Sequence, residues 1–101
     1  MSRQIVWQYG TTGTLGTGDN GLNGLFSAIE LKNGNILICD TINYRVLEVT
    51  KTRQIVWQYG TTGTLGTGDN GLNFPYSAIE LKNGNILICD RYNHRVLEVT
   101  R

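Results

Sequence analysis

Apolar residues along this chain fall into short groups with the two-residue period of β-strands, and glycine, asparagine and threonine separate the groups. Residues 54–59 are β-branched and aromatic, and alternation places Ile55, Trp57 and Tyr59 on one side of the expected strand. Further short strands are predicted at residues 77–81, 86–89 and 95–99. Since no segment carries a long apolar stripe of 3.6-residue period, the pattern predicts strands and no helix.

The whole pattern occurs twice. Residues 1–50 align with residues 51–100 without a gap, and the copies differ only at positions 1, 2, 24, 25, 26, 41, 42 and 44 of the first. Copies this similar must form the same structural unit, and a period of this length built from strands favours β-propeller blades. Residues 60–73 would then lead from the outermost strand of one blade to the innermost strand of the next. A flexible linker between two small domains is the alternative.

The stretch from Asn83 to Val96 resembles the signature of the NHL repeat: a Gly-Asn turn, an apolar strand, and then Asp-x-x-Asn-His-Arg-Val. Pro75, before the innermost strand, fits the same family. The first copy keeps the frame but has Tyr44 in place of the histidine and Leu25 in place of the proline. The resemblance covers both repeats and implies an all-β β-propeller with two four-stranded blades per chain and six blades in the ring. Because the 50-residue period is long for this family, a ring of eight blades is the alternative.

Two blades cannot close a ring, because propellers have roughly four to eight. Their uncovered apolar faces would cost several kcal/mol at about 25 cal/mol per Å². Head-to-tail association of identical chains covers both faces if the rotation closes. We therefore expect the chain to partner itself, as a homotrimer of six blades or a homotetramer of eight. Residues 1–101 would form one module whose outer strand, 4–9, pairs with residues 95–100 of a neighbouring chain.

Charge narrows the choice of partners. Nine basic residues nearly balance eight acidic ones, and a net charge of +1 gives no basis for binding nucleic acid or an anionic membrane. No apolar run approaches the roughly 20 residues of a membrane-spanning helix. The first residues also lack the basic and apolar regions of a signal peptide, so we expect a cytoplasmic protein.

Few residues could carry chemistry. Cys39 and Cys89 occupy matching strand positions without a CxxC spacing, which predicts buried thiols rather than a metal site or a disulfide. His94 is interpreted as a turn residue. An aspartate, an asparagine and an arginine recur after the second strand of each copy, as Asp40, Asn43 and Arg45 and as Asp90, Asn93 and Arg95. This pattern favours a hydrogen-bonded turn over a catalytic trio. We expect no catalytic residue, no cofactor and no enzyme activity, since a near-perfect repeat offers only symmetric residues.

Two glutamates are candidates for a channel site. Glu30 and Glu80 lie within the predicted innermost strands, where a closed ring would repeat a carboxylate once per blade. Such a ring of like charges is unfavourable unless it is hydrated, protonated or neutralised by cations. These residues therefore suggest a cation or ordered-water site. A carboxylate bonded to neighbouring backbone or arginine is the alternative.

The internal differences between the copies lie at one end of the strands, because positions 24–26 precede the innermost strand and positions 41–44 follow its antiparallel neighbour. Aromatic, cationic and hydrogen-bonding side chains suit this face to recognition. The alternative is that these loops simply tolerate sequence changes. The candidate residues are Phe26, Tyr44, Phe74, Tyr76, Arg91, Tyr92 and His94. The functional hypothesis is a non-enzymatic, self-assembling β-propeller scaffold, designed or derived from a larger amplified propeller. A binding module for protein, glycan or RNA is the alternative.

Overall fold

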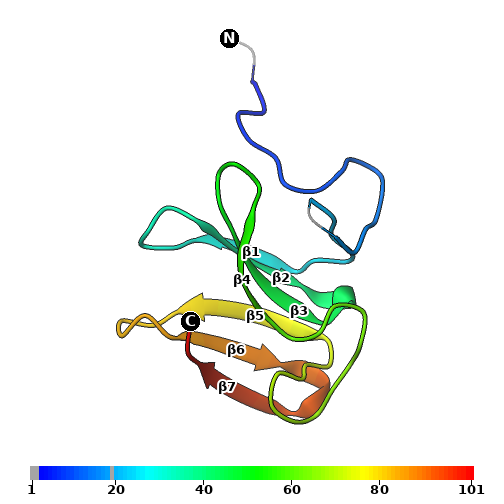
Figure 1. Ribbon diagram of the computed structural model, residues 1–101, viewed down its shortest axis with the longest axis vertical. Helices are drawn as coiled ribbons and strands as arrows, with labels where there is room; N and C mark the ends of the chain where they lie inside the picture. The colour runs from blue at the N-terminus through cyan, green and yellow to red at the C-terminus, as the bar shows by residue number, and fades with distance from the viewer. Residues whose placement is uncertain (1–2, 19) are drawn as a thin grey trace.

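The computed structural model describes residues 3–18 and 20–101, and its fold is all-β, with two antiparallel sheets (Figure 1). The first sheet has the order β1 (Ser27–Glu30), β2 (Ile36–Asp40), β3 (Arg45–Val49), β4 (Ile55–Tyr59). The second sheet has the order β5 (Pro75–Glu80), β6 (Ile86–Asp90), β7 (Arg95–Val99). Short 3₁₀ turns follow β2 at Thr41–Asn43 and β6 at Arg91–Asn93. Within the described ranges, no helix is long and apolar enough to cross a membrane.

The first sheet takes its fourth strand from the second repeat, as the sequence predicts. β4 pairs antiparallel with β3, with Tyr59 opposite Val46 and Trp57 opposite Glu48. A bulge then shifts the register, so that Ile55 packs with the residues on the other side of the sheet. The expectation that Ile55 shares a face with Trp57 and Tyr59 is therefore wrong, because the bulge breaks the alternation.

Residues 4–9 form no strand in the single chain, contrary to the prediction from their pattern. Ile5 and Val6 are 80% and 92% exposed. The reason is the lack of a ladder partner, since an extended segment without cross-strand hydrogen bonds is not a stable strand. Figure 1 shows that the N-terminal segment and β7 lie at opposite ends of the molecule, so the chain's own β7 does not serve as that partner.

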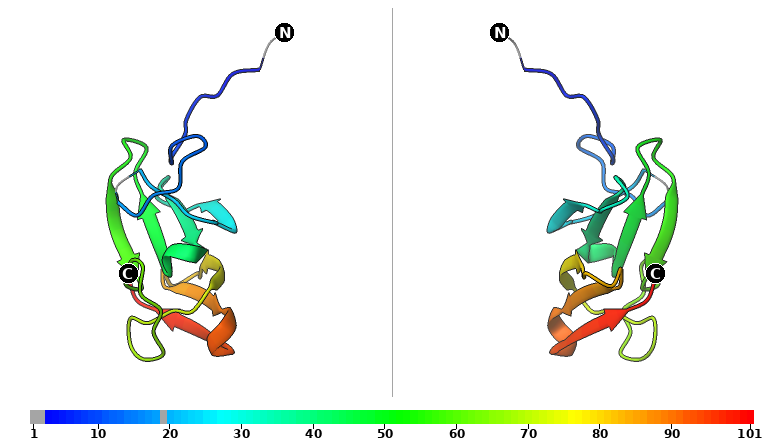
Figure 2. Two further views of the ribbon diagram at one scale, coloured as in Figure 1. Left: turned by 90° about the vertical axis from the view of Figure 1, so that its right-hand side faces the viewer. Right: turned by 90° about the vertical axis from the view of Figure 1, so that its left-hand side faces the viewer.

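The main apolar core lies where the two sheets meet, and we call this contact the inner seam (Figure 2). Leu37, Cys39 and Val46 enter it from the first sheet, and Ile86 and Ile88 enter it from the second. These five side chains are at most 1% exposed. Strand β5 runs along the inner seam against β1, β2 and β3.

The N-terminal segment is docked although it is unpaired. Trp7 and Tyr9 pack against Ile38, Leu47 and Val49, which lie on the face of the first sheet opposite the inner seam. The corresponding residues of the second repeat pack on the second sheet in the inner seam. Trp7 and Tyr9 are therefore in place, and the Gln8 carbonyl oxygen accepts from Arg53 Nε at 2.8 Å, while residues 4–9 have no strand beside them.

Candidate functional site

A buried polar cluster terminates the second strand of each sheet. The Oδ2 atom of Asp40 accepts hydrogen bonds from Asn43 Nδ2 and Arg45 Nε, both at 2.8 Å. The copy around Asp90 has the same bonds, with Arg95 Nε at 2.9 Å. The cluster also holds the preceding loop, because the Arg45 guanidinium donates to the carbonyl oxygen of Gly21 at 2.9 Å. The interpretation of these residues as a hydrogen-bonded turn is confirmed.

In the first sheet this cluster also receives the chain that follows β4. The Gly63 N–H donates to the carbonyl oxygen of Asn43 at 2.9 Å, and Arg45 donates to the Thr62 hydroxyl at 3.1 Å. Gly60, at φ +97°, lies so close to the carbonyl oxygen of Tyr44 that a Cβ atom would collide with it. We call the edge of β3 together with Asn43 and Arg45 the filled seat.

In the second sheet the matching surface has no such occupant among residues 3–18 and 20–101. We call the edge of β7 together with Asn93 and Arg95 the open seat. The Arg95 side chain is 28% exposed, against 2% for Arg45 in the filled seat. Val96 is 65% exposed, against 0% for Val46, which the second sheet also covers in the inner seam. Because the residues are identical, the difference lies in what covers them.

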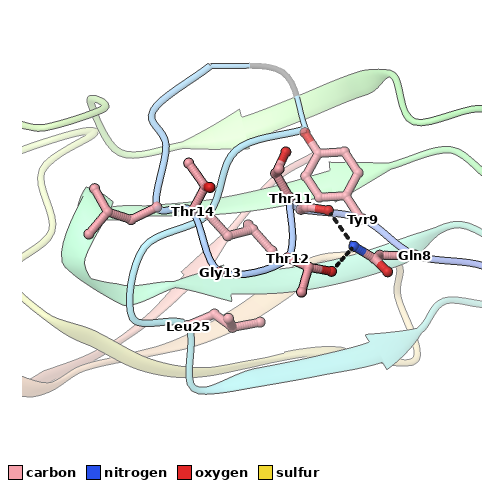
Figure 3. A pocket seen from close by; sticks show the side chains of 10 residues that line it. Gln8, Tyr9, Thr11, Thr12, Gly13, Thr14 and Leu25 are labelled. Atoms are coloured by element: carbon pink, nitrogen blue, oxygen red, sulfur yellow. Dashed lines mark hydrogen bonds between the residues drawn. The ribbon is translucent and has the colours of Figure 1, made fainter.

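Two pockets of about 340 Å³ each are lined by residues whose copies touch each other at the filled seat. The first lies beside the N-terminal segment and is lined by residues 8–15, Leu22 and Leu25 (Figure 3). The second lies at the open seat, and its lining residues are Cys89, Asp90, Arg91, His94, Arg95 and Val96. At the filled seat the matching surfaces touch each other, through the approach of Gly60 to Tyr44. Each pocket is therefore one half of a contact that the filled seat completes.

The loop beside the first pocket already has the shape of its bound copy. Gln8 Nε2 donates to the Gly10 carbonyl oxygen at 2.9 Å and to the Thr12 hydroxyl at 3.0 Å (Figure 3), and Gln58 makes the same two bonds in the second repeat. Asn20 accepts from the Gly10 N–H at 2.8 Å. Sequence reasoning missed this preformed loop, although the identity of residues 10–23 with residues 60–73 is the signal that could have found it.

The two cysteines also differ in burial between the two sheets. Cys39 is buried in the inner seam and its thiol donates to the carbonyl oxygen of Pro75 at 3.0 Å. Burial raises the pKa of the Cys39 thiol to about 12. Cys89, which lines the second pocket, is only partly buried. The two thiols should therefore differ in reactivity although they occupy the same position in the repeat.

Glu80 is held by neighbours rather than left free. It accepts from the Lys32 backbone N–H at 3.0 Å and from the Arg101 guanidinium at 3.2 Å. Its copy Glu30 is exposed. Among the described residues, no three His, Cys, Asp or Glu side chains lie close enough to hold a metal ion. The Glu80 contacts match the alternative interpretation of these glutamates, and a channel cation stays a prediction that concerns the ring.

Arg101 also pairs with Glu48 across the inner seam. Burial acts to raise the pKa of Glu48, but the hydrogen bonds from Asn33, Asn35 and Arg101 together outweigh it, so the pKa lies below its ordinary value. The ionised form of Glu48 therefore stabilises the folded chain.

Six of the seven recognition-face candidates form one continuous cluster. The rings of Phe26 and Tyr76 lie 4.5 Å apart across the inner seam, and the Arg91 guanidinium lies 5.2 Å from Tyr76 and 5.1 Å from Tyr92. Phe74 links Tyr92 at 5.0 Å to Tyr44 at 5.6 Å. The seventh candidate, His94, makes no ring contact in the described structure. It ends the 3₁₀ turn at φ +56° and lines the second pocket.

Together these features define an all-β repeat protein with one filled and one open strand seat. No known family model matches the chain, and no curated protein matches its sequence. The NHL-repeat resemblance therefore stays a prediction.

Proposed function

We propose that this protein is a non-enzymatic, self-assembling β-propeller scaffold, in which each sheet is one blade and copies of the chain associate head to tail into a closed ring. We favour six blades from three chains, with eight blades from four chains as the alternative. In the ring, residues 4–9 of one chain pair with β7 of the next as its fourth strand. The open seat then makes the contacts that the filled seat makes.

One observation carries the proposal: residues of the first sheet that β4 and the second sheet bury have identical copies in the second sheet that are exposed. The exposed fraction is 0% for Val46 and 65% for Val96. Each chain also presents the surface that would cover its neighbour, namely the docked and unpaired N-terminal segment. Head-to-tail association satisfies the open seat and the unpaired segment together, and it leaves no long unpaired strand edge.

Removing the donated strand tests the proposal. The full chain is expected to show the mass of three chains by light scattering coupled to size-exclusion chromatography, and a chain without residues 1–9 is expected to be monomeric or to aggregate. The substitution Ile42→Ser is a suitable control, because Ile42 is 42% exposed and lies outside both seats. This control should keep the oligomer. An oligomer of unchanged mass after the deletion contradicts strand exchange.

A second candidate function is recognition of a protein, glycan or RNA by the loop face, and the aromatic cluster favours it. Tyr76 and Tyr92 are 43% and 48% exposed while they flank the Arg91 guanidinium. Exposed aromatic and arginine side chains are enriched at binding hot spots, although the net charge of +1 disfavours RNA. Glycan, RNA and peptide arrays probed with the unaltered chain and with Arg91→Ala test it. Binding that the substitution abolishes supports recognition, and binding that it leaves unchanged argues against this face.

A further inference from the structure

The filled seat shows what a site of this kind recognises in an extended segment. The β3 edge pairs with the backbone of the bound strand. The Asn43 carbonyl oxygen accepts one N–H from the segment, and the Arg45 guanidinium donates one hydrogen bond to a threonine hydroxyl. It also requires a residue without a Cβ atom at the position of Gly60. All of these contacts come from the nine residues 55–63, whose Trp57 and Tyr59 side chains also pack against the second sheet.

The open seat carries the same recognition elements. The sequence of β7 is identical to that of β3, and Asn93 and Arg95 replace Asn43 and Arg45 without a change of residue type. The change from Tyr44 to His94 is harmless to this contact, because it is the backbone carbonyl of Tyr44 that meets Gly60. The Arg95 guanidinium keeps its bonds to Asp90 and Gly71, at 2.9 and 2.8 Å, and is therefore already oriented.

We propose that the open seat is a peptide-binding site, which captures in trans a free peptide with the sequence of residues 3–14 as an added antiparallel strand. This inference rests on the strand exchange of the proposed function and names its minimal partner. Addition of an extended peptide to a sheet edge takes its affinity from backbone hydrogen bonds and its specificity from side-chain seats. Here the specificity lies in Gly10, Thr12 and Gly13, which are the copies of Gly60, Thr62 and Gly63.

The peptide carries part of its bound shape within itself. In the chain, the Gln8 bonds to Gly10 and Thr12 fold back the residues after the strand, and Thr11 bridges to Thr14. These bonds join residues that the peptide contains, so they lower the ordering cost of capture. The chain's own copy of the segment lies at the opposite end of the molecule from β7, so it does not occupy the site in cis (Figure 1).

The substitution Gly10→Ala distinguishes the chain's ability to donate its N-terminal segment from its ability to bind one at the open seat. In the single chain, a Cβ atom at Gly10 meets only the Leu22 side chain, at 3.2 Å, whereas in a seat it would meet a backbone carbonyl. A chain with Gly10→Ala should therefore lose the ability to donate its segment and keep an open seat. Gly34→Ala is the matched control, because Gly34 also has a positive φ, +89°, but faces open space; it should leave assembly intact.

The test is fluorescence anisotropy of a labelled peptide of residues 3–14, titrated with the full chain carrying Gly10→Ala. We expect saturable binding, and at least about tenfold weaker binding of a peptide that itself carries Gly10→Ala. A peptide with Gln4→Ala should bind as the unaltered one does. As a second measurement, excess unaltered peptide added to the unaltered chain should lower its oligomeric mass. Equal binding of all three peptides, or no binding together with an unchanged mass, overturns the proposal.

The two proposals fail separately. An unaltered chain that forms a closed oligomer but takes up no peptide would refute the peptide site and leave the scaffold function standing. An unaltered chain that stays monomeric but binds the peptide would refute the scaffold function and keep the peptide site.

Discussion

The pair Val46 and Val96 allows a free energy to be assigned to the covering of the second sheet by a neighbouring chain, because β4 and the second sheet already cover Val46. A Val→Ala change removes about two methylene equivalents, or about 1.6 kcal/mol at about 0.8 kcal/mol per group. Val46 is 0% exposed, so Val46→Ala should lower the free energy of unfolding of each chain by about 2 kcal/mol once the cavity is included. Val96 is 65% exposed, so about two-thirds of its burial is gained only when a neighbour covers it. Val96→Ala should weaken each chain-to-chain contact by about 1 kcal/mol, or roughly fivefold.

Two measurements separate these effects. Sedimentation equilibrium over a concentration series gives the association constant, and a ring with three such contacts should lose about 3 kcal/mol in Val96→Ala. The free energy of urea unfolding of the dissociated Val96→Ala chain should then fall by only about 0.5 kcal/mol, which is the remaining third of about 1.6 kcal/mol. The reasoning is refuted if Val96→Ala leaves association unchanged, or if it destabilises the single chain as much as Val46→Ala does.

Three further outcomes follow from the seats and the inner seam. Gly60→Ala should cost at least twice the roughly 1 kcal/mol expected for Gly34→Ala, because both have a positive φ but only Gly60 abuts a carbonyl oxygen; equal urea midpoints would contradict this. Iodoacetamide should alkylate Cys89 of the dissociated chain at least about tenfold faster than Cys39, whose thiol pKa is raised to about 12; mass spectrometry that finds equal rates would contradict it. The depressed pKa of Glu48 adds stability that is complete above its unfolded pKa and is lost as the pH falls through its folded pKa, so Glu48→Gln should flatten the acid side of the stability profile; an unchanged slope would count against this role.

The strands and the core of each repeat were predictable because their signals are local. The apolar run from Ile36 to Cys39 predicts a strand covered on both faces, and the structure places Leu37 in the inner seam and Ile38 on the opposite face. The Asn-Gly turn before this strand has Gly34 at φ +89°, as a tight hairpin requires.

The departures from prediction depend on partners that local sequence does not specify. The bulge that turns Ile55 to the other face follows from the register of β3 against β4. The partners of Glu80 are Lys32, in the turn between β1 and β2, and Arg101, which follows β7. Residues 4–9 carry the sequence of a strand but need a second edge to become one, and the edge with matching residues is the open seat on the far end of the molecule.

The most direct test is the mass of the chain in solution across a dilution series, measured by native mass spectrometry and sedimentation velocity. A ring closed by strand exchange should give one discrete species of three chains, which dissociates to single chains on dilution without a series of larger species. A single chain at every concentration, or an open-ended series of oligomers, would contradict it.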